Sequence, residues 1–326
     1  MLKIAVIGAG RIGQIHARNV AAHPGARLAG IADLDAAAAS RLAEACLAPV
    51  LTLDTVFHAD AVMICSPTFT HADYIERAAS LGRPVFCEKP IDLSAARVRV
   101  CLAAVERAGI PLMVGFNRRF DPHFAALKRR LDAGEIGQLE MLTIISRDPS
   151  PPPLDYVARS GGLFRDMMIH DFDMARFLLG EEPVELFAAA ACLIDPAIAE
   201  EGDVDTAMVT LRTASGKMCQ ISNSRRATYG YDQRIEAHGS GGLLRAGNMT
   251  ATTIELANGQ GFTTDPALPF FLERYAAAYR AELDAFIAAI TDATPPTPDG
   301  ADGLAALVLA DAATRSAQTH EVEHFA

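Results

Sequence analysis

The first 33 residues constrain the fold of this chain more than any other segment. An apolar run, LKIAVI, leads directly into a glycine-rich turn, and a second apolar run ends at Asp33. In a strand–turn–helix unit of this kind, the first glycine permits a tight turn, the second lets the backbone approach a pyrophosphate, and the third lets the helix pack on the strand. The expected dinucleotide contacts are Gly8, Gly10, Arg11, Ile12, Gly13 and Asp33. The segment therefore predicts a Rossmann unit.

Asp33 also bears on which dinucleotide is bound. A carboxylate at the end of the second strand can accept hydrogen bonds from ribose hydroxyls, and its charge would repel a ribose phosphate. The next residues, Leu34 and Asp35, supply no arginine to reverse this preference, whereas Arg41 in the following helix is an alternative phosphate contact. We therefore expect NAD as the cofactor.

Length and charge narrow the class of protein. The chain has 326 residues, of which 50% are hydrophobic and 21% charged, and its formal net charge is −11. This length predicts two domains, and the acidic balance argues against nucleic acid as a partner. No apolar run is long enough to span a bilayer, and the N-terminus enters a strand directly rather than a signal peptide. The chain has six cysteines and no close Cys-x-x-Cys pair, which indicates reduced thiols in a cytoplasmic protein. We expect Cys87, at the end of an apolar run, to be a packing residue.

Short apolar runs alternate with helical patterns over the first part of the chain. Strands are expected at 2–7, 27–32, 60–65, 84–87 and 111–115, and helices at about 12–22, 35–46, 70–80 and 94–108. Strands that alternate with helices form parallel crossover units, so we predict an α/β fold that begins with a doubly wound parallel sheet. We place this Rossmann domain at residues 1–119.

The pattern changes after Pro122. Alternating apolar and polar runs predict a large, mostly antiparallel open sheet, with Ser215-Gly216 turning one hairpin. We therefore assign residues 120–326 to a second α/β domain, whose last helix could pack back on the first domain. The helices expected here span about 122–134, 162–179, 272–291 and 300–317.

Residues that follow the strands of a parallel sheet are the first candidates for chemistry, because ligands bind at that edge. Those expected to face the cofactor are Ser66, Pro67, Thr68, His71, Glu88 and Lys89. Lys89 stands out because the chain has twenty-five arginines and only four lysines. A lysine supplies a compact charge or a transferable proton that arginine does not. The alternatives are a surface lysine in a loop and, for His71, a role at the start of a helix.

Asp166 and His170 form the second candidate. They lie four residues apart on the helix expected at 162–179, so they share a face one turn apart and can touch. A carboxylate beside an imidazole fixes its tautomer and stabilises its cation, which makes histidine an effective general base. The alternatives are a helix cap on a solvated face and a metal site. Because no third histidine or paired cysteine lies nearby and Lys89 would repel a cation, we expect no metal.

Several segments then give the chain a recognisable resemblance. They are GAGRIG near the start, ICSPT at 64–68, VFCEKPIDL at 85–93, VGFNRRFDP at 114–122, RDPSPPPLDY at 147–156, GGLFRDMMIHDFDMARFLLG at 161–180 and SRRATYGYDQRIE at 224–236. With these segments the chain resembles the glucose–fructose oxidoreductase and inositol dehydrogenase family over nearly its whole length. The glycine loop and EKP are general to the family, whereas the last three segments are more particular to inositol dehydrogenases.

The resemblance implies NAD-dependent oxidation of a cyclitol secondary alcohol, first of all myo-inositol to 2-keto-myo-inositol (scyllo-inosose). It places catalysis on Lys89, Asp166 and His170. It implies that the second domain binds substrate and assembles a homotetramer through its open sheet. The implied substrate contacts are Lys89, Asn117, Arg147, Tyr156, Asp166, His170, Tyr229 and Tyr231.

Two other hypotheses remain open at this point. The same residues would serve another inositol stereoisomer, such as scyllo-inositol, or a pyranose sugar, with NAD or NADP, because these ligands differ only in the orientation of hydroxyl groups. The third hypothesis is a sensor that binds NAD without turnover. The presence of Lys89, Asp166 and His170 together argues against a sensor, which has no need of all three.

Overall fold

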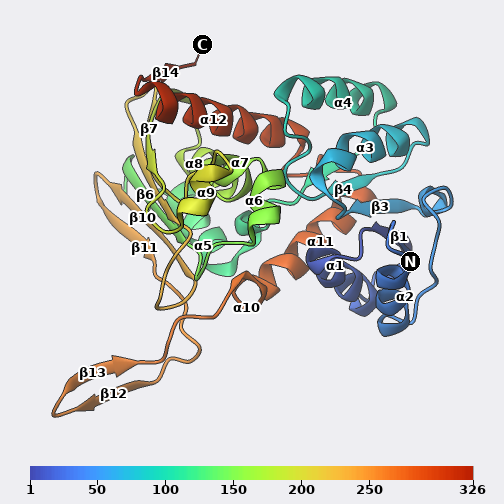
Figure 1. Cartoon of the computed structure of the whole chain (residues 1–326), viewed down its shortest axis with the longest axis horizontal. Coiled ribbons are helices and arrows are strands. Elements are labelled where there is room, and N and C mark those ends of the chain that lie inside the picture. Colours follow the sequence, from blue (N-terminus) through green and yellow to red (C-terminus); the bar gives the residue numbers. More distant parts are fainter. Residues whose placement is uncertain (326) are drawn as a thin grey trace. The chain divides into compact units, whose positions relative to one another are not determined.

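The structure is a computed structural model that describes residues 1–325 (Figure 1). Its contacts divide the chain into two compact units. The first unit contains residues 1–120 and 278–307, and the second contains residues 121–277 and the remainder from Val308. The first unit is therefore built from two separate stretches of the chain.

The first unit contains a five-stranded parallel sheet, which confirms the predicted Rossmann fold (Figure 1). Its strand order is β2-β1-β3-β4-β5. The order changes direction beside β1, so the carboxyl ends of β1 and β3 flank the place where such sheets bind ligands. The strands are β1 (Leu2–Ile7), β2 (Ala26–Ala32), β3 (Ala61–Ile64), β4 (Val85–Cys87) and β5 (Leu112–Val114).

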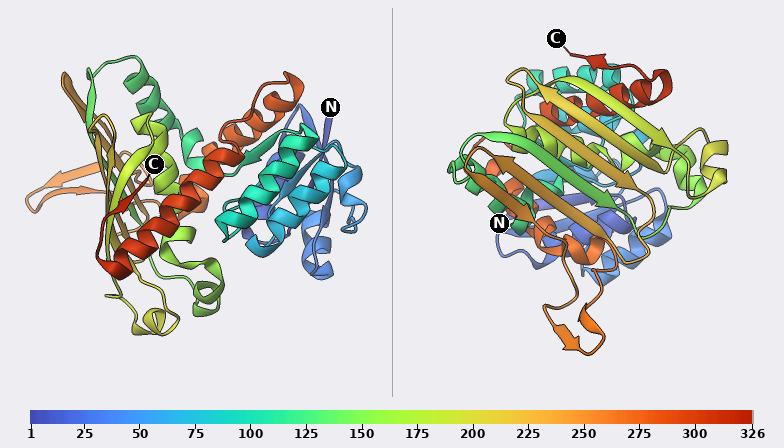
Figure 2. Two further views of the ribbon diagram at one scale, coloured as in Figure 1. Left: turned by 90° about the horizontal axis from the view of Figure 1, so that it is seen from above. Right: turned by 90° about the vertical axis from the view of Figure 1, so that its left-hand side faces the viewer.

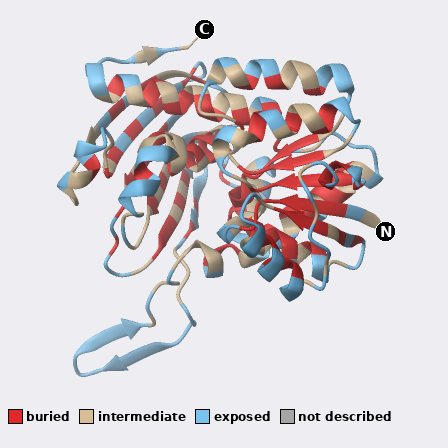
Figure 3. Cartoon of the chain, turned by 45° about the vertical axis from the view of Figure 1, so that its right-hand side comes forward, coloured by how far each residue is buried: buried red, intermediate tan, exposed pale blue. Residues whose placement is uncertain are grey.

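Helices bury both faces of this sheet, and its strands are almost wholly inaccessible to solvent (Figure 3). The four helices predicted in the first part of the chain are confirmed within one or two residues at either end. Leu283 and Phe286 of α11 (Ala276–Thr291) join the same apolar core as strand residues Ile4 and Phe86. The predicted helices are α1 (Arg11–Ala22), α2 (Ala36–Ala45), α3 (His71–Ser80) and α4 (Ala95–Ala108).

The second unit is formed around a seven-stranded sheet of order β11-β10-β6-β9-β8-β7-β14. All neighbouring strands are antiparallel except β6 and β9, so the prediction of a mostly antiparallel sheet is confirmed. The predicted turn at Ser215-Gly216 joins β8 to β9, and Gly216 adopts φ +93° there. The strands are β6 (Leu139–Arg147), β7 (Pro183–Ala191), β8 (Thr206–Thr213), β9 (Met218–Ser224), β10 (Asp232–Gly239), β11 (Gly242–Ala246) and β14 (Glu323–His324).

One face of this sheet packs against helices, and the other is free of them among the described residues (Figure 2). Alternate strand residues such as Leu142, Ile144 and Val209 are buried on the helical face. Their neighbours in sequence point to the other face and remain partly accessible to solvent. The helices of this unit are α5 (Pro122–Asp132), α6 (Leu154–Ser160), α7 (Gly162–Asp166), α8 (Ile169–Leu179), α9 (Pro196–Glu200), α10 (Phe271–Arg274) and the later turns of α12 (Gly300–Thr319).

Two predicted helices are wrong in their continuity. The helix expected at 162–179 is interrupted at Met167 and Met168, between α7 and α8. Both methionines keep right-handed helical angles, but Met168 N–H donates to Leu163, five residues back, so the regular hydrogen-bond series slips by one residue. The helix expected at 272–291 is likewise split, into α10 and α11.

A small hairpin, β12 (Glu255–Asn258) and β13 (Gly261–Thr264), extends from the second unit with every residue exposed (Figures 1 and 3). The sequence analysis did not predict it.

No helix within residues 1–325 is both long and apolar enough to cross a membrane.

Candidate functional site

The turn between β1 and α1 shows why two of its glycines are required by the fold. Gly8 has φ +106°, and a Cβ there would lie 2.5 Å from the carbonyl carbon of Cys65. A Cβ on Gly13 would lie 2.0 Å from the carbonyl oxygen of Gly8. Gly10 differs, because it has φ −67° and a Cβ there would meet nothing within 4 Å. The open space beside Gly10, at the N-terminus of α1, therefore fits the close approach of a pyrophosphate.

Asp33 lies against this turn. Ala9 N–H donates to Asp33 Oδ2 at 2.6 Å, and Asp35 N–H donates to Oδ1 at 2.7 Å. The structure thus brings together the glycine turn and the acidic residue that the sequence analysis assigned to one dinucleotide site. Leu34, the next residue, is 78% exposed. The set of residues fits an NAD molecule whose ribose hydroxyls meet a carboxylate.

The loop after β3 and the turn after β4 are joined through His71. Its Nδ1 lies 2.8 Å from the carbonyl oxygen of Pro90, and its Nε2 lies 2.7 Å from that of Ser66. Burial lowers the pKa of His71, so near neutral pH one ring nitrogen carries the proton and donates to one of these carbonyls. His71 therefore ties Ser66, Pro67 and Thr68 to the turn at Lys89.

Glu88 and Lys89 occupy the turn after β4. Lys89 is half-buried and its peptide bond to Pro90 is cis. The side chain of Glu88 is directed into the core, where its Oε1 lies 2.7 Å from Nε2 of His16. Asn117 follows β5 at the same edge of the sheet and is 3% exposed. The first unit thus gathers its predicted residues at the carboxyl ends of its strands.

In the second unit, Asp166 is held by two neighbours. Tyr156 donates its hydroxyl to Asp166 Oδ1 at 2.8 Å, and Nη1 of Arg225 lies 3.6 Å from Oδ2. Arg225 is almost fully buried and also lies 3.4 Å from Asp203, which caps the start of α7 by accepting from Leu163 N–H. Asp166 is thus fixed by a hydroxyl donor on one oxygen and a buried guanidinium beside the other.

His170 lies in the first turn of α8, on the far side of the methionine break from Asp166. The spacing argument from an unbroken helix is therefore wrong as a description of the backbone here. Asp166 ends α7 and His170 is the second residue of α8, and both side chains are half-buried. Their relative placement is set by how each helix is anchored.

The anchor of α8 is Asp171, which the sequence analysis did not select. Its carboxylate accepts from Ser146 Oγ at 2.6 Å and from Asn223 Nδ2 at 2.9 Å, and all three residues are buried. Ser146 lies on β6 and Asn223 on β9, so the first turn of α8 is bonded to two central strands. No local pattern distinguishes Asp171 from the neighbouring acids, because its partners are distant in sequence.

The remaining predicted substrate contacts differ in environment. Arg147 and Tyr229 are brought together, since Arg147 Nη1 donates to the Tyr229 hydroxyl at 3.2 Å. That hydroxyl donates in turn to Asp232 at 2.7 Å. Tyr231, by contrast, is 4% exposed and its ring packs edge-on against those of Phe270 and Tyr275. The ring of Tyr231 thus packs in the interior of this unit.

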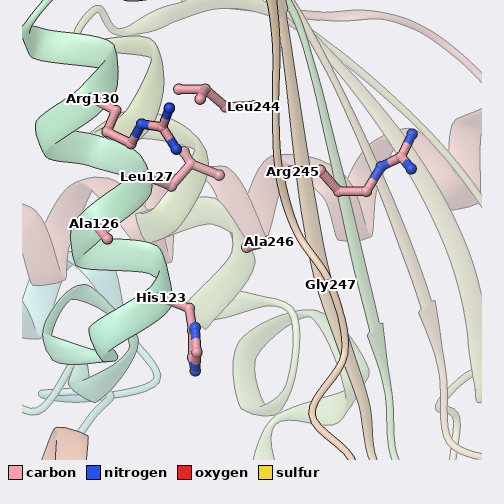
Figure 4. A pocket seen from close by; sticks show the side chains of 8 residues that line it. All are labelled: His123, Ala126, Leu127, Arg130, Leu244, Arg245, Ala246 and Gly247. Carbon is pink, nitrogen blue, oxygen red and sulfur yellow. The ribbon is translucent and has the colours of Figure 1, made fainter. Parts of the chain in front are cut away.

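A separate hollow of about 220 Å³ lies between α5 and β11 (Figure 4). Its two arginines are already paired, Arg130 with Glu135 and Arg245 with Glu236, and the side chain of Arg245 is directed away from α5. None of the predicted site residues lines it. We assign it no role.

A parallel sheet with a glycine turn and a carboxylate, followed by a unit built on a large mixed sheet, defines the class of Rossmann-type oxidoreductases that use a dinucleotide. Residues 2–116 match the oxidoreductase family with an NAD-binding Rossmann fold, and residues 124–245 match the GFO/IDH/MocA C-terminal domain. This chain belongs to the GFO/IDH/MocA family, and its cofactor is NAD.

The chain is similar to known proteins over nearly its whole length. It is 58% identical over 318 residues to an inositol 2-dehydrogenase of Rhizobium meliloti, covering 97% of this chain and 96% of that protein. It is 45% identical to a myo-inositol 2-dehydrogenase of Thermotoga maritima, again covering 97% and 96%. The crystal structure of a myo-inositol dehydrogenase from Corynebacterium glutamicum superposes with a TM-score of 0.96 at 49% identity and covers 100% and 99% of the two chains.

Proposed function

We propose that this protein is an inositol 2-dehydrogenase that oxidises myo-inositol to 2-keto-myo-inositol with NAD+. The assignment of the ring alcohol is supported by the names of its near-full-length relatives. The observation that carries the chemistry is the fixed carboxylate of Asp166, which is held by Tyr156 and Arg225 immediately before the helix that bears His170.

We assign the catalytic roles to Lys89, Asp166 and His170. His170 accepts the proton of the reacting hydroxyl, and general base catalysis of this kind contributes about 10²–10⁴ in rate. Asp166 stabilises the imidazolium that forms. Lys89 stabilises negative charge on the substrate oxygen, a contribution of about 10²–10³ in rate for one well-placed donor. When bound, NAD+ supplies the acceptor for the hydride.

The other predicted residues bind and orient. We assign the pyrophosphate to the glycine turn, with Arg11 and Ile12 at the start of α1, and the ribose to Asp33. Ser66, Pro67, Thr68, His71 and Glu88 shape the rest of the cofactor edge. We assign polyol contacts to Asn117, Arg147, Tyr156 and Tyr229, with Tyr231 supporting them from the core.

We further propose that the enzyme is a cytoplasmic homotetramer. All six cysteines are free, which suits a reducing compartment. The outer face of the seven-stranded sheet carries Ile145, Phe187 and Met208, which no helix of the described chain covers. Apolar residues on such a face are typical of an interface between copies.

Replacing His170 by alanine tests the assignment. We expect kcat for myo-inositol to fall by about 10²–10⁴ while the dissociation constant for NAD+ stays within about twofold, because the base acts only on the proton. Absorbance of reduced cofactor gives the rate, and fluorescence titration gives the affinity. His58→Ala, at an exposed position, is the matched control. Equal losses of turnover and NAD+ affinity in His170→Ala would contradict the role.

The same assay separates the open alternatives. Wild-type enzyme is compared at equal concentration on myo-inositol, scyllo-inositol, glucose, xylose and galactose with each cofactor. The proposal predicts the highest kcat/KM for myo-inositol with NAD+. A higher kcat/KM for scyllo-inositol or a sugar would identify that ligand as the substrate. The absence of turnover with any polyol would favour the hypothesis of a sensor that binds NAD.

A further inference from the structure

The break between α7 and α8 leaves Asp166 and His170 without a continuous helix to fix their spacing. The hydrogen bonds of an unbroken helix hold residues that are four apart at a constant separation. Here Asp166 is the last residue of α7, and His170 lies in the first turn of α8. Because α7 has only five residues, it does not hold its conformation alone in water. Another part of the fold must therefore set the separation of the two side chains.

Both helices are bonded to the same end of one strand. Asn223, on β9, donates from Nδ2 to Asp171 of α8 at 2.9 Å. Arg225, which follows the last residue of β9, has Nη1 3.6 Å from Oδ2 of Asp166. Asn223 and Arg225 are each 1% exposed, whereas Ser224 between them is partly accessible. Asn223 and Arg225 therefore continue the alternation of the strand and point to the same face of the sheet.

The backbone of Arg225 is fixed to the sheet independently of α7. Its N–H donates to the carbonyl oxygen of Asp205, the residue immediately before β8, at 2.9 Å. The carboxylate of Asp205 accepts in turn from the backbone N–H groups of Leu193, Ile194 and Asp195, at distances between 2.8 and 3.1 Å. These bonds hold the segment between β7 and β8 in place. The sheet and this segment thus determine where the guanidinium begins its approach to α7.

The guanidinium of Arg225 bridges the two ends of α7. Its Nη2 lies 3.4 Å from Oδ2 of Asp203, and Oδ1 of Asp203 accepts from Leu163 N–H at 2.8 Å at the start of the helix. The carboxylate of Asp203 also packs on Gly162, where a Cβ would lie 2.7 Å from Oδ1. At the other end of α7, Nη1 of Arg225 contacts Asp166. One buried cation therefore contacts both the residue that caps α7 and the residue that ends it.

Stability alone does not require an arginine at this position. A guanidinium and two carboxylates lose their hydration when they are buried, and well-packed apolar residues in place of such a group are often at least as stabilising. An apolar side chain, however, cannot orient a carboxylate. Arginine presents a planar group whose two Nη atoms contact two carboxylates at once, and lysine has a single ammonium that cannot reproduce this geometry. The residue type at 225 therefore suits the placement of Asp166.

We propose that Arg225 is a positioning residue, which together with Asn223 makes the end of β9 the template that sets the separation of Asp166 from His170. Asn223 places α8 through Asp171, and Arg225 places α7 through Asp166. The strand thus replaces the helical continuity that is lost at the methionine break. This inference rests on the proposed roles of Asp166 and His170. Its consequence is that Arg225 contributes to turnover through Asp166 alone.

The first experiment measures the template without reference to activity. Amide hydrogen exchange is followed by mass spectrometry in peptides that cover α7 and the first turn of α8. We expect Arg225→Lys to exchange at least about tenfold faster than wild type in α7, and Asn223→Ala to do so in the first turn of α8. Arg226→Lys, the same change at the adjacent exposed position, should exchange as the wild type does. Unchanged exchange of α7 in Arg225→Lys would overturn the proposal whether or not the protein oxidises inositol.

The second experiment measures turnover of myo-inositol with NAD+ in a double-mutant cycle. Arg225→Lys should lower kcat by about 10–10², because a displacement of about 1 Å at the reacting groups has an effect of this size. Asp166→Asn should lower kcat by more. In the Asp166→Asn background, Arg225→Lys should change kcat by less than about twofold, since no carboxylate is left to position. Arg226→Lys should leave kcat unchanged, and the dissociation constant for NAD+ should stay within about twofold in every variant.

The outcomes separate this inference from the assigned reaction. If the losses of kcat in Arg225→Lys and Asp166→Asn multiply, Arg225 does not act through Asp166, and the inference is overturned while the reaction stands. If Asp166→Asn turns over myo-inositol at the wild-type rate, the catalytic role of Asp166 is wrong, and the inference is overturned with it. If the wild type turns over no polyol, the assigned reaction is overturned, and the exchange experiment decides the template.

Circular dichroism and thermal unfolding establish that each variant is folded. If Arg225→Lys does not fold, Asp203→Asn takes its place in both experiments. Asparagine keeps an oxygen for Leu163 N–H but removes one carboxylate from the guanidinium. We expect faster exchange in α7 and a loss of kcat of about threefold or more that disappears in the Asp166→Asn background. Unchanged exchange in α7, or an equal loss of kcat in both backgrounds, would overturn the proposal.

Discussion

The carboxylate of Asp33 is positioned by the chain itself. Two backbone N–H groups, of Ala9 and Asp35, donate to its oxygens and orient it beside the glycine turn. A side chain fixed in this way discriminates through both its hydrogen bonds and its charge.

Replacing Asp33 by serine should therefore weaken the preference for NAD. We expect the ratio of kcat/KM for NAD+ to that for NADP+ to fall by about tenfold or more, corresponding to about 1.4 kcal/mol or more. Asp35→Ser, which removes a neighbouring carboxylate and leaves a residue that also caps α2 well, should keep the ratio. An unchanged ratio in Asp33→Ser would show that Asp33 does not determine the preference for NAD over NADP.

The glycines of the first turn should respond differently to alanine. Gly13→Ala places a Cβ against the Gly8 carbonyl oxygen and should lower the free energy of unfolding by about 1–3 kcal/mol. Gly10→Ala meets no protein atom, so stability should change by less than about 0.5 kcal/mol while NAD+ affinity falls. Urea unfolding and cofactor titration measure the two quantities. A Gly10 variant that binds NAD+ normally would contradict the assignment of the pyrophosphate.

Among the helices, α8 is anchored by side chains rather than by continuity with α7. The bonds from Ser146 and Asn223 to Asp171 join its first turn to β6 and β9. Ser146 Oγ also lies 2.9 Å from Oε1 of Gln233, yet its single proton can go to only one acceptor. The hydroxyl of Tyr275 lies 3.3 Å from the same amide oxygen, so Gln233 of β10 belongs to the same buried network.

Removing this anchor should destabilise the second unit. Asp171→Ala leaves two buried donors unpaired and should lower the free energy of unfolding by about 2–4 kcal/mol. Asp155→Ala, in an exposed pair with Arg159, should change it by less than about 1 kcal/mol. Chemical denaturation measures both variants. A loss for Asp171→Ala no larger than for Asp155→Ala would show that α8 is held by packing alone.

At the scale of the whole molecule, the outer face of the seven-stranded sheet is not covered by any helix within residues 1–325 (Figure 2). The strand register places Met208 beside Ala189 and Ser222 on the outer face of the seven-stranded sheet. This face is the surface to which we assign self-association.

A charge at its centre should prevent assembly. We expect Met208→Glu to sediment as a smaller species than wild type with the same circular dichroism, because an interface cannot bury an unpaired carboxylate. Val100→Glu, at an exposed position of α4 in the other unit, is the control and should leave the assembly unchanged. An unaltered sedimentation of Met208→Glu would place the interface elsewhere.

The sequence predicted well those features that local patterns determine. The strands of the parallel sheet appear in the sequence as short apolar runs, because each is buried on both faces. The glycine turn and Asp33 were predicted from their spacing along the chain, which is also a local pattern. By contrast, the slip at Met167 and Met168 leaves the helical pattern intact, so periodicity could not reveal it.

Other features depend on contacts between distant residues. Asp171 and Glu282 look like any helical acid in the sequence, and only burial distinguishes them. Arg225 was contained in a recognised segment but was not selected, because its partner Asp203 lies beyond the reach of any local motif. The hairpin of β12 and β13 contains too few alternating residues to stand out.

The division of the first unit between two stretches of chain has a consequence for biosynthesis. Residues 1–120 leave the ribosome long before α11 exists, and Leu283, Phe286 and Ile287 belong to their core. Until those residues are translated, the nascent Rossmann unit exposes the hydrophobic surface on which they will later pack. The cofactor half of this enzyme thus completes its core only after residues 121–277 of the second unit have been translated, and early termination of translation leaves a fragment prone to aggregate.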